Sequence, residues 1–313
     1  MPETSQIKFR HRLEYAFVRL FEAGFRATPY KLCLWNACAL ARFAFHVVRW
    51  RRAEALRRIR QVFPGISEKE ARHIAYRSLR NILLNAAEMM HLRGVSKDWI
   101  ARHVRNCDET MGKIKAALQG KGAILALPHY GNWDLAGIIV AHYGMPIFSI
   151  AGVQHNPLTN DWINSKRATG ITILDRGSVA LRQILKRLKG GEVFAILPDV
   201  RMKTPDIEVD FLGAKANLGR GMAAFARKTG APILLANVRR LDIATHRLDV
   251  GDPIVPDASL SEEDDIRRMT TEAMAAIEAQ IRGDPGQWFW YNKRWVLEPL
   301  AERQEDKPCG QPV

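Results

Sequence analysis

Residues 122–143 have the sequence GAILALPHYGNWDLAGIIVAHY, in which a histidine and an aspartate lie five positions apart. The apolar run over 123–127 predicts a buried strand, because it is short and is bounded by glycine and proline. Residues 134–143 predict a helix. We therefore expect His129 where a strand ends and Asp134 where the next helix begins. In open α/β sheets, ligands bind in the crevice at the carboxyl ends of the strands.

His129 and Asp134 are the two residue types that form a general base and the carboxylate that orients it. A carboxylate at a helix N-terminus stays ionised because it faces the positive end of the helix dipole. It can accept a hydrogen bond from one imidazole nitrogen and leave the other basic. A simpler interpretation is that Asp134 only caps the helix. Between the two, Gly131 permits a tight turn, and Asn132 and Trp133 offer hydrogen-bond donors.

After residue 104, short apolar runs alternate with helical segments. Predicted strands cover residues 123–127, 147–151, 171–174, 193–197, 233–238 and 248–250. Predicted helices cover residues 109–119, 134–143, 157–168, 178–189, 219–229 and 261–282. This alternation indicates a mostly parallel sheet covered by helices on both faces. We expect a helical region over 1–103, in which Ser67–Glu70 forms a capping box, an α/β core over 104–300 and a polar tail over 301–313.

The chain is strongly basic, with a formal net charge of +14, which indicates an anionic partner. Residues 1–60 hold 13 Lys and Arg against 4 Asp and Glu, interleaved with aromatic and aliphatic residues. This mixture is typical of an amphipathic element on a membrane surface, and no recognised nucleic-acid motif accompanies it. The apolar run 32–48 is interrupted by polar residues and favours an interfacial or tilted helix over a full span. A signal peptide is the competing interpretation.

Polar residues follow a second predicted strand as well. Asp199 and Arg201 come directly after the run 193–197. If that strand is adjacent and parallel to 123–127, both side chains share the crevice with His129. An arginine at this edge would bind a phosphate or an oxyanion through two parallel hydrogen bonds.

Three further stretches are candidates that also have simpler explanations. Arg167 and Arg176 flank one short predicted strand, although an ordinary surface position explains either alone. Residues 211–221, FLGAKANLGRG, contain Arg220 and predict a glycine-rich turn into a helix, suited to backbone contacts with an anion. Plain loop geometry also explains these glycines. Residues 287–295 are dense in aromatics and cations, a composition shared by an amphipathic segment that covers a core.

Several blocks in order along the chain resemble the bacterial lipid A biosynthesis acyltransferases, including relatives that acylate phosphatidylinositol mannosides. The blocks are Glu14-Tyr15 with Arg19-Leu20, Val62-Phe63-Pro64, a long helix containing Glu88, residues 129–134, Asn156-Pro157-Leu158, Arg167, Pro198-Asp199-Val200-Arg201, Phe211-Leu212-Gly213, Gly230-Ala231-Pro232, Gln287-Trp288-Phe289-Trp290 and Arg294-Trp295. Three positions depart from the family pattern: Leu218 replaces a frequent threonine, Asn292 a frequent histidine and Pro198 a common glutamine. These departures bear on the donor and the acceptor, not on the reaction.

The resemblance implies the glycerolphosphate-acyltransferase fold, and a histidine–acid dyad that moves an acyl chain from acyl carrier protein or coenzyme A to a lipid hydroxyl. Carried over by position, His129 is the catalytic base and Asp134 its orienting carboxylate. The residues expected to bind substrate, three of them in matching blocks that line the site, are Arg167, Asp199 and Arg201, together with Asn132, Trp133 and Arg220.

The expected reaction is direct acyl transfer without a covalent enzyme intermediate. His129 removes the proton of the acceptor hydroxyl as it attacks the thioester, a contribution of roughly 10²–10⁴-fold. Arg167 or backbone N–H groups around Gly131 are candidate donors to the oxyanion. No metal or cofactor is expected, since no cluster of side chains has metal-ligand spacing; acyl carrier protein or coenzyme A carries the acyl chain.

The expected partners are anionic membrane lipid, a glycolipid acceptor and the acyl thioester, with no nucleic acid. The basic N-terminus would hold the enzyme on the cytoplasmic face of the inner membrane. A lipid A precursor is the expected acceptor, and a phosphatidylinositol mannoside or a lysophospholipid is the alternative. The rival from another class is a non-enzymatic peripheral protein that binds anionic lipid.

Overall fold

A computed structural model of the chain describes residues 7–91, 94–118, 120–150, 156–167, 170–174 and 179–298. The predicted polar tail over 301–313 lies outside these residues, as does Arg176. The N-terminal part is helical, as predicted, with helices α1 (Phe9–Ala27), α2 (Tyr30–Phe43), the π-helix η1 (Ala44–Val48), α3 (Arg52–Val62), α4 (Glu68–His91) and α5 (Lys97–His103).

The remaining elements alternate between strands and helices. The strands are β1 (Val104–Arg105), β2 (Ala123–Ala126), β3 (Ile147–Ile150), β4 (Ile171–Leu174), β5 (Val193–Ile196), β6 (Ile207–Phe211), β7 (Ala214–Leu218), β8 (Ile233–Arg240) and β9 (His246–Val250). The helices are α6 (Cys107–Leu118), α7 (Trp133–His142), α8 (Pro157–Arg167), α9 (Ala180–Lys189), α10 (Gly221–Thr229), α11 (Glu262–Gly283) and the 3₁₀ turn η3 (Pro285–Gln287). All six predicted strands are present within a few residues of their expected ends.

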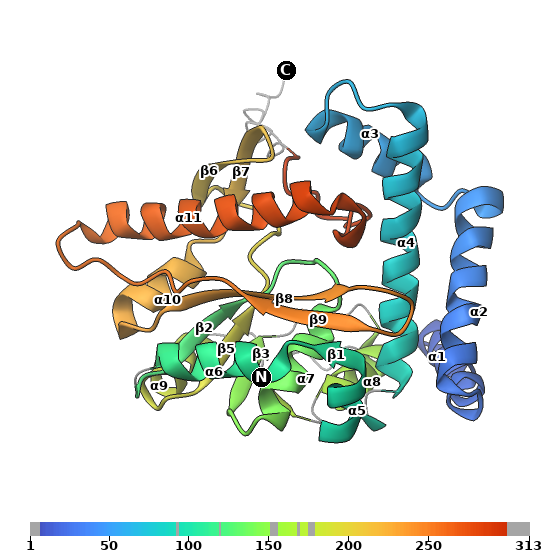
Figure 1. Cartoon of the computed structure of the whole chain (residues 1–313), viewed down its shortest axis with the longest axis horizontal. Coiled ribbons are helices and arrows are strands. Elements are labelled where there is room, and N and C mark those ends of the chain that lie inside the picture. Colours follow the sequence, from blue (N-terminus) through green and yellow to red (C-terminus); the bar gives the residue numbers. More distant parts are fainter. Residues whose placement is uncertain are drawn as a thin grey trace, which may run out of the picture.

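Seven strands form one sheet in the order β1-β9-β8-β2-β5-β3-β4. Strands β8, β2, β5, β3 and β4 are parallel, and β9 is antiparallel to β8. All four residues of β2 are buried, as expected for a central strand that helices cover on both faces. Helices α10 and α11 lie on one side of β8, and α6 and α7 on the other (Figure 1). The predicted mostly parallel sheet flanked by helices is therefore confirmed.

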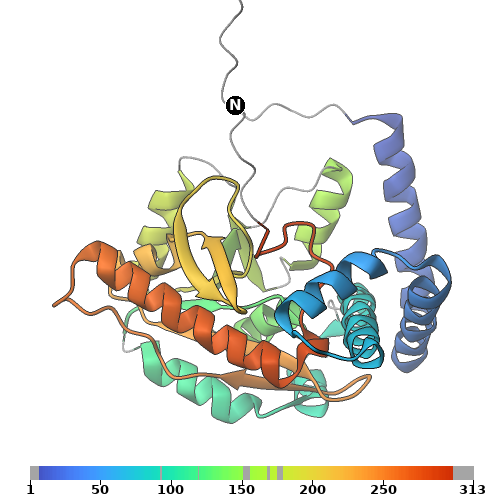
Figure 2. The ribbon, with the colours of Figure 1, turned by 90° about the horizontal axis from the view of Figure 1, so that it is seen from above.

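Most of the glycine-rich stretch 211–221 belongs to a β-hairpin, and its interpretation as an anion-binding turn is wrong for residues 211–218. Strands β6 and β7 pair antiparallel, and the hairpin lies beside α11 (Figure 2). Its turn is Leu212-Gly213, with φ of 53° and 80°. Positive φ at both central residues is the geometry of a two-residue hairpin turn. Buried residues alternate with exposed ones along β6, a period-2 pattern that marks a half-buried strand.

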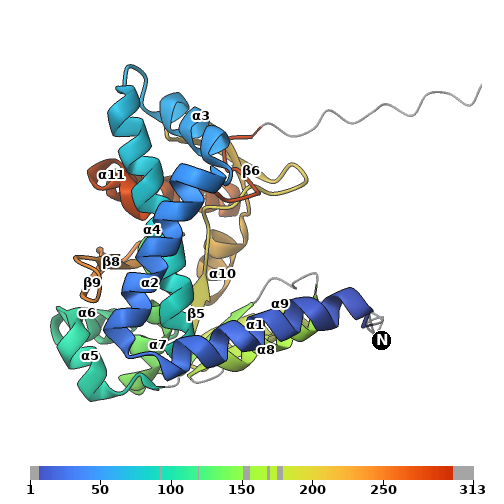
Figure 3. The same cartoon turned by 90° about the vertical axis from the view of Figure 1, so that its right-hand side faces the viewer.

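The N-terminal helices pack against the sheet domain at two places: α4 packs against the η3 turn, and α1 lies along α8 (Figure 3). Helix α4 also packs against α2 and α3. The Asn156 amide at the start of α8 donates to the carbonyl oxygen of His11 in α1 at 2.9 Å. Side chains of α3 and α4 share one apolar core with α10, α11 and Trp288, Trp290 and Trp295. The helical region and the sheet thus meet at the segment that follows α11.

Candidate active site

His129 lies just beyond the carboxyl end of β2, and Asp199 just beyond the end of β5. The two strands are adjacent and parallel, with Ala126 beside Ile196 in the register. The imidazole Nδ1 of His129 is 2.8 Å from Oδ1 of Asp199, and the backbone N–H of His129 donates to Oδ2 at 2.8 Å. The Asp199 side chain is 1% exposed and that of His129 is 17% exposed. One carboxylate therefore fixes both the ring and the backbone of the histidine.

Trp288 completes the hydrogen bonding of Asp199. Its indole N–H donates to Oδ2 at 2.8 Å. Burial alone would raise the pKa of Asp199, but the interaction with His129 and the hydrogen bonds from His129 and Trp288 outweigh it and hold the pKa below its usual range. An ionised carboxylate only accepts hydrogen bonds, so Nδ1 of His129 carries the proton and Nε2 is the basic nitrogen. This is the arrangement of a general base with an orienting carboxylate.

Asp134 lies in the first turn of α7, as predicted, and is half-buried. The sequence predicts that Asp134 accepts a hydrogen bond from one imidazole nitrogen of His129. In the structure Asp199 contacts the imidazole at Nδ1, and it reaches the histidine from a neighbouring strand. A catalytic contribution from Asp134 stays a prediction. Of the two carboxylates, the structure shows Asp199 in contact with the imidazole.

The backbone N–H groups of the turn after His129 donate to carbonyl oxygens of the protein. This differs from the expectation that they bind the oxyanion. The N–H of Tyr130 donates to Pro128, that of Gly131 to Gln287, and that of Asn132 to Val238, at distances of 2.6 Å, 3.1 Å and 2.8 Å from the carbonyl oxygens. These three N–H groups are engaged inside the protein and are not available as donors to the oxyanion. Arg167 remains the other predicted donor.

The side chain of Asn132 is also engaged inside the protein. It is buried, its amide oxygen accepts from the N–H of Leu135, and its amide nitrogen donates to Glu88 at 2.6 Å. Asn132 is thus the N-cap of α7. Its predicted contact with substrate stays a prediction, but the structure shows its amide supporting the turn that carries His129.

Aromatic rings surround the imidazole. The Trp133 ring lies edge-on to His129 with centroids 5.1 Å apart, and it stacks on Phe289 at 6.2 Å. The backbone N–H of Phe289 donates to the carbonyl of His129 at 2.9 Å. Trp288 and Phe289 were not among the predicted site residues, although the aromatic density of residues 287–295 was the available signal. These rings give the base an apolar surrounding suited to an acyl chain.

The three predicted arginines come from different segments of the chain. Arg167 is the last residue of α8, and its side chain lies outside the described residues. Arg201 is half-buried, and its guanidinium lies 3.9 Å from Glu298. Arg220 precedes α10 and pairs with Asp206 and Glu263, each at 2.8 Å. Asp206 also accepts from the backbone N–H of Arg220 at 3.1 Å, so carboxylates of the protein already occupy this predicted anion site.

The arrangement around His129 suits proton transfer from a hydroxyl in a partly water-excluded place. Within the described ranges, no three His, Cys, Asp or Glu side chains gather in a way that would hold a metal ion. The chemistry that the described groups support is that of a base, an orienting carboxylate and an apolar wall.

Comparison with known proteins places this geometry in a family. The model of the family described as bacterial lipid A biosynthesis acyltransferase matches residues 3–296. The phosphatidylinositol mannoside acyltransferase of Mycolicibacterium smegmatis is 26% identical over 194 residues, which cover 59% of this chain and 60% of that relative. The lipid A biosynthesis lauroyltransferase of Escherichia coli strain K12 is 23% identical over 281 residues, 87% of each chain.

Among solved structures, the 1-acyl-sn-glycerophosphate (LPA) acyltransferase of Thermotoga maritima aligns over 80% of this chain and 96% of that chain, with 17% identity and a TM-score of 0.37. The resemblance found in the sequence blocks is confirmed by the family match. Because that match spans nearly the whole chain, the protein belongs to the bacterial lipid A biosynthesis acyltransferase family.

Proposed function

We propose that this protein transfers a fatty acyl chain from an acyl thioester to a hydroxyl group of a glycolipid, with a lipid A precursor as the acceptor. The observation that carries the proposal is the His129–Asp199 pair, which leaves a basic imidazole nitrogen beside an apolar aromatic wall. Membership of an acyltransferase family supplies the reaction class. Acyl carrier protein or coenzyme A is the proposed acyl carrier.

In the proposed reaction, Nε2 of His129 takes the proton of the acceptor hydroxyl while the hydroxyl oxygen attacks the thioester carbonyl. The resulting oxyanion collapses, the carbon–sulfur bond breaks, and the thiolate leaves with the proton from Nε2. Asp199 keeps the proton on Nδ1 and stabilises the imidazolium that forms between the two steps. The protein forms no covalent bond with the acyl chain.

A phosphatidylinositol mannoside is the second candidate acceptor, because a relative named phosphatidylinositol mannoside acyltransferase is 26% identical to the chain over the aligned residues. Both acceptors are anionic glycolipids with free sugar hydroxyls. The family departures at Leu218, Asn292 and Pro198 leave this choice to experiment.

We also propose that α1, α2 and the π-helix dock on the cytoplasmic surface of the inner membrane. Large apolar side chains of these helices are exposed, including Phe9, Phe17, Leu20, Leu32, Trp35, Phe43, Val47 and Val48. The segment Tyr30–Val48 is long and apolar enough to cross a membrane. Exposed apolar residues mixed with basic ones are typical of an interfacial helix on an anionic surface, and we favour that mode.

The test of the proposed function uses the full-length protein, radiolabelled dodecanoyl-CoA and dodecanoyl-acyl carrier protein as donors, and vesicles that contain either a lipid A precursor or a phosphatidylinositol mannoside. We expect mass spectrometry to show one added acyl chain on one of the two acceptors. His129→Ala should lower the rate by at least about 10²-fold without lowering vesicle binding. Transfer at the wild-type rate by this variant would contradict the mechanism. Vesicle binding without acylation of either acceptor would favour the non-enzymatic lipid-binding alternative.

A further inference from the structure

A second group of buried charges lies against the turn that carries His129. Glu88 on α4 and Arg240 on β8 form an ion pair with two hydrogen bonds of 2.8 Å and 2.6 Å. Their side chains are 4% and 2% exposed. Removing two charges from water is costly, and an apolar pair of similar volume often serves stability equally well. Stability alone therefore does not explain why the protein keeps this buried ion pair.

Glu88 and its neighbour Asn85 bind the two residues at the centre of the turn. Oε2 of Glu88 accepts from the side-chain amide of Asn132 at 2.6 Å. Asn85, one helical turn earlier on α4, donates to the carbonyl of Gly131 at 2.6 Å and accepts from Arg240 at 2.8 Å. Because Gly131 and Asn132 lie between the histidine and α7, these contacts set the path of the chain on both sides.

The same group reaches the segment that supplies the aromatic wall. The side-chain amide of Gln287 accepts from the backbone N–H of Arg240 at 3.2 Å and donates to its carbonyl at 2.8 Å. The carbonyl of Gln287 in turn accepts from the N–H of Gly131. Trp288, the next residue, donates to Asp199. We call Asn85, Glu88, Arg240 and Gln287 the buried frame. Hydrogen bonds connect this frame both to the turn that carries His129 and to the segment whose Trp288 binds Asp199.

The charge state of the frame suits this role. Burial raises the pKa of Glu88, but the ion pair with Arg240 and the nearby His246 outweigh it and hold the pKa well below its usual range. Glu88 is therefore an ionised acceptor, and an ionised acceptor makes a stronger hydrogen bond to the Asn132 amide than a neutral one.

We propose that Glu88 is a positioning residue for acyl transfer: acting through Asn132, and with Arg240 as its counter-ion, it fixes the turn that aims His129 and begins α7. This inference rests on the proposed function of His129 as the base. Misplacing a reacting group by about 1 Å can cost about 100-fold in rate. Loss of the frame should therefore lower kcat more than it changes KM.

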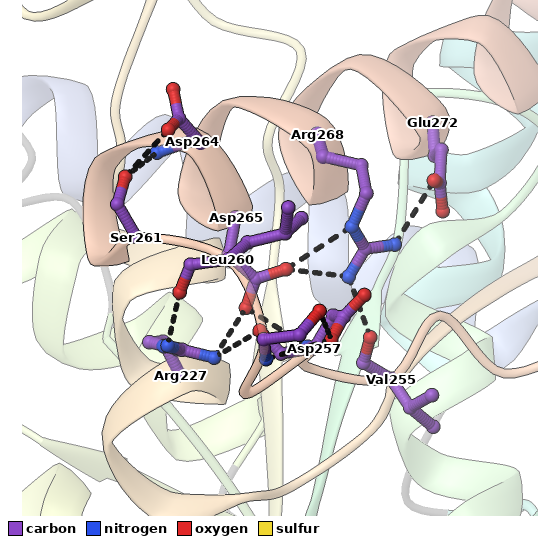
Figure 4. A network of polar contacts seen from close by, with 10 residues as sticks. Arg227, Val255, Asp257, Leu260, Ser261, Asp264, Asp265, Arg268 and Glu272 are labelled. Atoms are coloured by element: carbon purple, nitrogen blue, oxygen red, sulfur yellow. Dashed lines mark hydrogen bonds and ion pairs between the residues drawn. The ribbon is translucent and has the colours of Figure 1, made fainter.

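A separate buried charge cluster provides a matched control. Asp265 in α11 is also a fully buried carboxylate with two arginines, Arg227 at 3.1 Å and Arg268 at 2.6 Å, and it accepts from the backbone N–H of Asp257 (Figure 4). This cluster joins α10, α11 and the loop before α11. Its hydrogen bonds hold that loop, so Asp265→Asn disturbs a buried charge cluster without touching the turn after His129.

The experiment compares Glu88→Gln, the double variant E88Q/R240M and Asp265→Asn in the full-length protein. The double variant removes both charges of the Glu88–Arg240 pair, so it keeps the test open if Glu88→Gln fails to fold. With dodecanoyl-CoA as donor and lipid A precursor vesicles as acceptor, we expect E88Q/R240M to lose about 10-fold to 100-fold in kcat, with KM for the donor within about twofold. Asp265→Asn should keep kcat and lose only stability in urea.

A second readout needs no activity. In protein labelled with ¹⁵N-histidine, and with His129 assigned by comparison with His129→Ala, the Nδ1–H proton should exchange slowly with solvent in the wild type and in Asp265→Asn. It should exchange at least about 10-fold faster in E88Q/R240M. If the wild type transfers no acyl chain, the proposed function fails while this readout still decides the positioning role. Unchanged kcat with unchanged proton exchange in a folded E88Q/R240M protein would overturn the inference, as would an equal loss of kcat in Asp265→Asn.

Discussion

Nδ1 of His129 lies 2.8 Å from Oδ1 of Asp199, although 70 positions separate the two residues in the chain. The strands that precede them are neighbours in the sheet, so their carboxyl ends bring the imidazole and the carboxylate together. The same carboxylate accepts from the backbone N–H of His129 and from the Trp288 indole. Three donors on one buried carboxylate leave it little freedom to rotate, so the imidazole that it binds is held in one orientation and one tautomer.

We therefore expect Asp199→Asn to lower kcat by about 10²–10⁴-fold, because the amide cannot hold the proton on Nδ1 as an ionised carboxylate does. The measurement is steady-state acyl transfer over a range of donor concentrations, in which KM should change little. Asp134→Asn provides the comparison, since Asp134 is the carboxylate that the sequence spacing selected. A larger loss of kcat in Asp134→Asn than in Asp199→Asn would contradict the assignment of ring orientation to Asp199.

The sequence predicted the location of the base but not its whole environment. Strand-end residues are recognisable because an apolar run stops at a polar residue, and this rule identified both His129 and Asp199. The choice between Asp134 and Asp199 depended on strand order, which one sequence does not contain. Contacts such as Glu88 with Arg240, 152 positions apart, depend on how α4 packs on β8. Such packing leaves no local pattern in either segment.

The missed hairpin has a different cause. The three glycines of residues 211–221 suggested a turn into a helix, although just before them Ile207, Val209 and Phe211 alternate with charged residues in a strand pattern. Of these glycines, Gly213 lies in the hairpin turn, where its φ of 80° favours glycine. A count of period-2 alternation would have predicted the strand.

Gly131 is expected to tolerate no side chain. Its φ is 61°, and a Cβ there would lie 2.0 Å from the carbonyl oxygen of Val238. Gly144 is the control, with a φ of 79° and no atom within 4 Å of an added Cβ. Gly144→Ala should cost only the left-handed strain, about 1–3 kcal/mol. Gly131→Ala carries the same strain and must also move β8 or the turn.

Urea unfolding of both variants measures this difference, and activity is measured beside it. We expect Gly131→Ala to lose more unfolding free energy than Gly144→Ala and to lose acyl transfer as well. Equal stability of the two variants would show that the turn can move away from β8 without cost, contrary to the close approach in the structure.

Acid should destabilise the protein through Glu88 and Asp199, whose pKa values are both lowered in the folded state. A carboxyl group with a depressed folded pKa contributes stability above its unfolded pKa, near 4.5 for Glu88, and that stability is lost as pH falls toward the folded value. Each such group can contribute a slope of up to about 1.4 kcal/mol per pH unit.

Urea unfolding at several pH values between 7 and about 3 tests this for Glu88. E88Q/R240M lacks the titrating carboxyl group, so its unfolding free energy should fall less steeply than that of the wild type below about pH 4.5. The gap between the two curves should be constant at neutral pH and change only in the acid range. Parallel curves over the whole range would show that Glu88 keeps its usual pKa in the folded protein.

Membrane docking should depend on exposed aromatic side chains of the N-terminal helices. Trp35 on α2 is 63% exposed and Phe17 on α1 is 62% exposed. Burying one such side chain contributes about 1.5–3 kcal/mol, so Trp35→Ser should weaken binding to phosphatidylglycerol vesicles by about 10-fold or more. Val255→Ser, at a residue that is 56% exposed in the loop before α11, is the control and should bind as the wild type does.

Salt separates the two modes of attachment in the same vesicle assay. An interfacial helix held partly by the basic N-terminus should bind less tightly at 0.5 M than at about 0.1 M salt, where the Debye length is about 10 Å. A segment that spans the bilayer would stay with the vesicles at both salt concentrations. Retention that neither salt nor Trp35→Ser reduces would therefore exclude interfacial docking and assign the segment Tyr30–Val48 to a true span.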